Sequence, residues 1–102
     1  MDNKRLLMEI ERRIRETNRS TLNPLFPEFT PEQIEPSTQM VADARAEYLL
    51  EFNRLTQLSV EGNHIDYNEV KSLRDKRLIY EELLAASKAL ETAIERGYLD
   101  VE

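Results

Sequence analysis

Residues 66–97, DYNEVKSLRDKRLIYEELLAASKALETAIERG, decide the fold because they contain no Pro, and no Gly before the last residue. Asp66 is a favoured N-cap residue, and Glu69 follows it at the spacing of a capping box. Gly97 suits the left-handed position that closes a helix. The sequence therefore predicts one helix over about residues 67–96, which at 1.5 Å per residue is about 45 Å long.

Apolar residues of this helix recur at heptad spacing, the pattern typical of a coiled coil. Two interleaved sets, which we call the seam, have members seven residues apart, with polar interruptions at Lys76 and Ser87: Leu73, Tyr80, Ser87 and Ile94, and Lys76, Leu83 and Leu90. A helix of this length exceeds the radius of gyration of about 13 Å for a compact domain of 100 residues. The seam therefore predicts packing against the chain's other two helices, or against one of them and a second subunit.

A preceding helix is predicted over about residues 38–61, with Gly62 as its stop signal. Its expected core stripe follows spacings of three and four: Val41, Ala44, Tyr48, Phe52 and Leu55. Only four residues separate this helix from the cap at Asp66, so the two helices are expected to form an antiparallel hairpin.

The first helix is predicted over about residues 2–18 and is amphipathic. Its apolar residues share one arc: Leu6, Leu7, Ile10 and Ile14. Its charges form i,i+4 pairs, among them Glu9 with Arg13 and Arg12 with Glu16. Nucleic-acid binding through Arg12, Arg13, Arg15 and Arg19 is the weaker alternative to a self-neutralised solvent face.

All four prolines fall within residues 20–37, which predicts a Pro-rich connector. It holds at most one short helical turn, which begins at Thr30 and ends before Pro36. This strap is rich in apolar residues, namely Leu22, Leu25, Phe26 and Phe29. Their side chains are expected either to close one end of the bundle or to dock a partner.

These elements predict an all-α fold over a single helical domain, residues 1–102. It is a three-helix bundle built on a long antiparallel helical hairpin, with the Pro-rich strap between the first and second helices.

Composition argues against an enzyme. The chain has no Cys, two Gly and one His, so thiol chemistry, a phosphate-cradling glycine loop and a paired-histidine metal centre are not expected. His64 lies in the predicted turn, and the carboxylates of Asp43, Glu47 and Glu51 fall on a charged helix side. We expect no catalytic residue, cofactor, metal site or small-molecule substrate.

The function expected is a non-enzymatic protein–protein interaction or assembly module, such as a small adaptor, chaperone or structural subunit, with a protein partner or a homo-oligomer. Its predicted interface combines the apolar seam and the strap: Leu73, Tyr80, Leu83, Leu90, Ile94, Leu25, Phe26 and Phe29.

The alternative is a small acidic inhibitor or regulator that docks on a basic site of an enzyme or nucleic-acid-binding protein. The net charge is -6; residues 1–20 hold six basic and four acidic residues, a net of +2, so residues 21–102 carry -8. This charge and the lack of a long apolar run argue against nucleic acid and membrane as partners and favour a cytoplasmic location.

Overall fold

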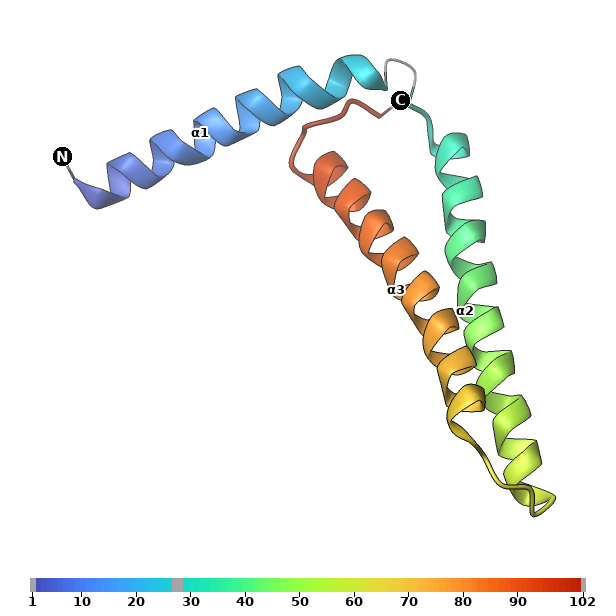
Figure 1. Cartoon of the computed structure of the whole chain (residues 1–102). Helices are drawn as coiled ribbons and strands as arrows, with labels where there is room; N and C mark the ends of the chain where they lie inside the picture. The colour runs from blue at the N-terminus through green and yellow to red at the C-terminus, as the bar shows by residue number, and fades with distance from the viewer. Residues whose placement is uncertain (1, 27–28, 102) are drawn as a thin grey trace. The chain divides into compact units, whose positions relative to one another are not determined.

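The computed structural model describes residues 2–26 and 29–101, and these form helices and turns with no strand. The elements are α1 (Asn3–Leu22), a 3₁₀ turn η1 (Asn23–Leu25), α2 (Pro31–Val60) and α3 (Tyr67–Glu95), as Figure 1 shows. The predicted all-α fold, with three helices of which the second and third pack together, is confirmed.

The chain divides into two compact units, Met1–Ile34 with Ala89–Glu102, and Glu35–Lys88. The prediction of a single domain over residues 1–102 stays a prediction.

The unit Glu35–Lys88 is the hairpin. Lys76 Nζ lies 3.4 Å from a carboxylate oxygen of Glu47, and Arg54 Nη2 lies 2.6 Å from one of Glu69. From the first of these ion pairs to the second, the residue number on α2 increases from 47 to 54 while that on α3 decreases from 76 to 69. The two helices are therefore antiparallel. Val41, Ala44 and Leu55 are the buried apolar residues of α2.

The predicted core stripe of α2 is wrong at Phe52, which is 58% exposed. Glu51 takes the inward position instead, with only 11% of its side chain exposed. Successive residues of a helix point about 100° apart around its axis, so Glu51 and Phe52 face different directions. Arg54 stabilises the inward Glu51 carboxylate through two hydrogen bonds.

Both glycines close helices as the sequence predicts. The N–H of Gly97 donates to the Ile94 carbonyl and that of Tyr98 to the Ala93 carbonyl, the two bonds of a Schellman motif. Gly62 closes α2 with the equivalent pair of bonds. Their φ angles are +76° at Gly97 and +83° at Gly62, a region that side chains with a Cβ rarely occupy.

Asp66 caps α3 as predicted, because its carboxylate accepts a hydrogen bond of 3.0 Å from the Glu69 N–H. The Glu69 side chain does not complete the predicted capping box in the described contacts. Its carboxylate binds Arg54 of α2 instead.

The unit formed by Met1–Ile34 and Ala89–Glu102 is held together by its C-terminal tail. Ala93, Tyr98 and Leu99 are buried together, and Leu22, Leu90 and Ile94 pack against them. Arg19 donates to both carboxylate oxygens of Asp100, at 3.0 and 2.8 Å, and to the Gly97 carbonyl at 2.9 Å. The tail therefore docks on the last turn of α1.

These tail contacts explain the first correction to the predicted connector 20–37. α1 continues through Leu22 instead of ending near residue 18. Arg19 binds Gly97 and Asp100, which lie 78 and 81 positions away, and Leu22 packs against the buried cluster of Ala93, Tyr98 and Leu99. Helix propensity within residues 19–22 does not contain that information.

The second correction lies at the other end of the connector, where α2 begins at Pro31 rather than near residue 38. Thr30 starts the helix as predicted, since its N–H donates to the Gln33 side chain at 2.8 Å. The predicted stop before Pro36 is wrong: Pro36 lies inside the helix. Pro36 has no N–H to donate to the Glu32 carbonyl, and both residues are exposed.

Candidate interaction surfaces

The predicted seam of α3 is turned toward the chain's own helices. All seven of its heptad positions are half-buried, namely Leu73, Lys76, Tyr80, Leu83, Ser87, Leu90 and Ile94. Tyr80 stacks on Tyr48 of α2, with ring centroids 6.0 Å apart and planes inclined by 29°. Leu90 and Ile94 pack against the tail cluster. The seam thus has neighbours within the chain, and packing of α3 against a second subunit stays a prediction.

The strap residues of the predicted interface differ in how far they are exposed to solvent. Phe29 is buried, and Phe26 meets it edge to face with ring centroids 5.7 Å apart. Leu25 is 68% exposed at the end of η1. Phe29 therefore belongs to the interior of its unit, while Leu25 remains available on the surface. Residues 27 and 28 of the strap lie outside the described residues.

An ion triad joins α2 to α3 in the hairpin. Arg54 Nη2 lies 2.6 Å from Glu51 and 2.6 Å from Glu69. The Arg54 hydrogen bond holds the pKa of the Glu51 carboxyl below its ordinary value and outweighs the opposing effect of desolvation. Because Glu51 is the most buried member, its charge depends on Arg54.

Replacing Arg54 by alanine is expected to lower the free energy of unfolding by about 1–3 kcal/mol, because it leaves the inward Glu51 carboxylate without its main partner. The pKa of Glu51 is lower in the folded chain, so its stabilisation is present above the ordinary carboxyl pKa and is lost as pH falls through the folded value. Urea titrations of wild type and Arg54→Ala at pH 7 and pH 3 measure both effects, and the difference between the two proteins should shrink at pH 3. Lys71→Ala, on an exposed part of α3, is the matched control; a loss as large as that of Arg54→Ala contradicts the argument.

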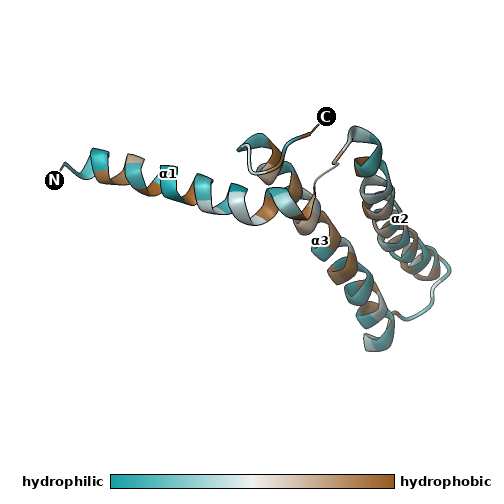
Figure 2. Ribbon diagram, turned by 90° about the horizontal axis from the view of Figure 1, so that it is seen from above, coloured by the Kyte–Doolittle hydropathy of each residue, from teal (hydrophilic) through white to brown (hydrophobic). Residues whose placement is uncertain are grey.

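The apolar arc of α1 is the surface that sequence reasoning did not assign to an interface. α1 contains no buried residue, and its four aliphatic side chains at helical spacing are 42–60% exposed: Leu6, Leu7, Ile10 and Ile14. We call these four residues the α1 stripe. Figure 2 shows apolar positions recurring along α1 between polar ones. The amphipathic spacing identified these residues, but the expected packing within a bundle gave no reason to assign them to an interface.

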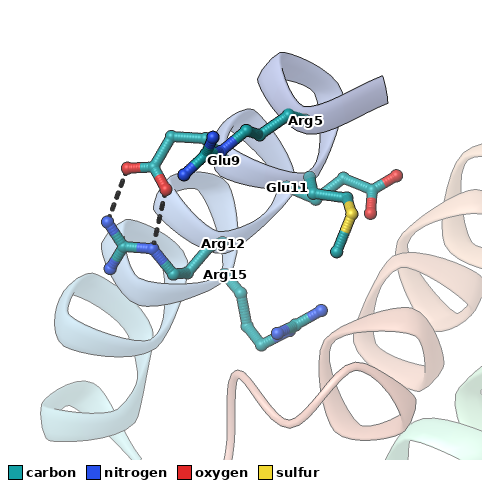
Figure 3. A pocket seen from close by; sticks show the side chains of 6 residues that line it. Arg5, Glu9, Glu11, Arg12 and Arg15 are labelled. Carbon is teal, nitrogen blue, oxygen red and sulfur yellow. Dashed lines mark hydrogen bonds and ion pairs between the residues drawn. The ribbon is translucent and has the colours of Figure 1, made fainter. Parts of the chain in front are cut away.

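The charged side of α1 is largely neutralised by its own residues. Glu9 accepts hydrogen bonds from Arg12 at 3.1 and 2.6 Å (Figure 3). It also accepts one from Arg13 at 3.0 Å. These contacts, with Arg12 first, lower the pKa of Glu9 to about 2. Arg12 also lies 2.7 Å from Glu16. Since Asp100 engages Arg19, three of the four arginines considered for phosphate binding already have carboxylate partners, which weakens the nucleic-acid alternative.

We searched the described residues for groups that could bind a metal ion and for helices that could span a membrane. No cluster of three or more His, Cys, Asp or Glu residues that could hold a metal ion occurs within residues 2–26 and 29–101. His64 lies in the turn that precedes α3. Over the same part of the chain, no helix is long and apolar enough to cross a lipid bilayer.

Comparison with models of protein families, with curated proteins and with solved structures finds no match to this chain. The surfaces described above are therefore the ground for assigning a function.

Proposed function

We propose that the chain is a non-enzymatic protein–protein interaction module, and that the α1 stripe is the surface it offers to a protein partner. The observation that carries this proposal is a helix with one continuous aliphatic face and no buried residue. Helices in soluble proteins gain most of their stability by burying such a face. A partner that covers the stripe provides that burial.

The charges of α1 favour a protein over a lipid surface as the partner. Interfacial membrane helices carry mainly Lys and Arg on their polar face. Here Glu9, Glu11 and Glu16 share the polar face with the arginines, and Glu9 binds Arg12 and Arg13. Such a face gains little from anionic lipid.

Ile10→Asp tests the proposal, and Met8→Asp is the matched control. Both residues are exposed on α1, but Met8 lies two positions from Ile10 and so on nearly the opposite side of the helix. Partners recovered from the native host are identified by mass spectrometry, purified and titrated by calorimetry, and sedimentation tests a second copy of the chain as partner.

Wild type and Met8→Asp are expected to bind alike, whereas Ile10→Asp should weaken binding about tenfold or more, because a buried aliphatic side chain contributes about 1.5–3 kcal/mol. Binding through apolar area should also persist at about 1 M salt. A purified partner that binds Ile10→Asp as tightly as wild type overturns the assignment to the α1 stripe.

The acidic regulator remains a second candidate, supported by the net charge of -8 on residues 21–102. Its binding to a basic site would fall steeply as salt is raised and would be insensitive to Ile10→Asp. The same titrations therefore separate the two functions.

A further inference from the structure

A shallow groove on the hairpin joins an apolar floor to a cationic rim. It has a volume of about 260 Å³ and is lined by Tyr48 of α2 and by Val70, Leu73, Arg74 and Arg77 of α3. The four α3 residues follow spacings of three, one and three, so they share one face over two turns. All five residues belong to the unit Glu35–Lys88.

The floor of the groove is held in place before any partner arrives. The Tyr48 ring stacks on Tyr80, and Arg45 fixes Tyr80 by a hydrogen bond of 3.1 Å to its hydroxyl and by a position 5.3 Å from the ring centre. A floor that is already ordered costs less conformational entropy on binding. Phe52, one turn beyond Tyr48 on α2, is exposed and lengthens the apolar surface along α2.

The rim carries positive charge in a chain that is acidic as a whole. Among the described residues, Arg74 has no ion pair or hydrogen bond through its side chain. Arg77 has only an exposed contact of 3.7 Å with Glu81, longer than a hydrogen bond. Arg54 of the same hairpin, by contrast, already binds two carboxylates at 2.6 Å. No carboxylate lines the groove.

We infer that this groove binds an acidic, amphipathic segment of a partner protein. An aliphatic or aromatic side chain of that segment fills the floor between Tyr48, Val70 and Leu73, and two of its carboxylates pair with Arg74 and Arg77. The arginines are three residues apart, so carboxylates one helical turn apart match them. Guanidinium groups bind carboxylates bidentately, which gives the contact direction as well as energy.

This surface lies on the hairpin and does not depend on the α1 stripe. A partner could engage either surface without the other, and Ile10→Asp should leave the groove intact. A result that overturns the assignment of the α1 stripe therefore leaves the inference about the groove standing, and the reverse also holds.

Fluorescence anisotropy tests the groove with a fluorescein-labelled helical peptide of about 14 residues, which carries leucines on one face and glutamates flanking them. A second peptide has glutamine in place of every glutamate. A labelled single-stranded oligonucleotide of similar length tests nucleic acid as the ligand. Binding of each probe is measured to wild type, to Arg74→Glu and to Lys88→Glu, which reverses an exposed charge 14 residues further along α3, about 21 Å from Arg74.

The acidic peptide is expected to bind wild type and Lys88→Glu alike, to bind Arg74→Glu about tenfold more weakly, and to lose affinity as salt rises. The glutamine peptide should bind about tenfold more weakly than the acidic one. The inference is overturned if the acidic peptide does not bind at about 0.5 mM, or if both peptides bind with equal affinity. It is also overturned if Arg74→Glu and Lys88→Glu lose affinity equally, or if the oligonucleotide binds more tightly with the same dependence on Arg74.

Discussion

Leu55→Asp is expected to unfold the α2–α3 hairpin at neutral pH. Leu55 is 7% exposed and is one of only three buried residues of α2. The substitution removes about 1.5–3 kcal/mol of apolar burial and adds the cost of burying a carboxylate, which amounts to several kcal/mol more. The free energy of unfolding of a single domain is only about 5–15 kcal/mol in total. A loss of several kcal/mol from a core of this size is therefore a large fraction of it.

Thermal and urea unfolding followed by far-UV circular dichroism measure the effect. Leu50→Asp is the matched control, because the same change falls on the same helix at a side chain that is 64% exposed. It should alter the free energy of unfolding by about 0.5 kcal/mol or less. Similar losses in the two variants would show that the inward face of α2 has been misassigned.

The ends of α3 were predictable from the sequence because their signals are local. A capping carboxylate at Asp66 acts within one turn, and a left-handed glycine at Gly97 acts on the carbonyls just before it. The heptad seam was predictable for a related reason. Its seven positions follow from helix geometry alone, and the structure half-buries every one of them.

The connector was less predictable because its two ends depend on different kinds of information. Pro36 is a strong local signal against helix, yet α2 runs through it. The last turn of α1 depends on Asp100 and the buried tail cluster, which lie far away in the sequence. The helix propensity of residues 19–22 depends only on nearby residues, so it does not report such distant contacts.

The candidate surfaces could be predicted only in part. Spacing identified the residues of the α1 stripe but not what covers them, since amphipathicity reports a face and not its neighbour. The groove was beyond sequence reasoning, because it forms only when Tyr48 of α2 meets Val70, Leu73, Arg74 and Arg77 of α3. Knowing the register between the two helices is necessary to see that arginines flank an apolar floor.

Leu99→Asp is the second substitution expected to have a large effect, because Leu99 is the most buried of the core residues, at 4% exposed. It packs with Ala93 and Tyr98, and Leu22 of α1 packs against the same cluster. A carboxylate there faces the same desolvation cost of several kcal/mol. The tail should therefore leave the last turn of α1, and the Arg19–Asp100 ion pair should be lost with it.

Tyr98 provides a direct measurement of that loss. Hydrogen bonds from Arg96 first, and then from Asn18 of α1, hold the pKa of the Tyr98 hydroxyl below its ordinary value. When the tail detaches, the Asn18 contact breaks and the pKa should rise toward that of a free tyrosine, which ultraviolet absorbance follows as the phenolate forms. Val101→Asp, two residues further on and 38% exposed, is the control and should keep the wild-type titration. The Asp100 N–H also donates to the side-chain oxygen of Asn23 at 3.0 Å. Unchanged Tyr98 titration in Leu99→Asp, together with an unchanged melting temperature, would mean that the tail is anchored by its polar contacts to Arg19 and Asn23 alone.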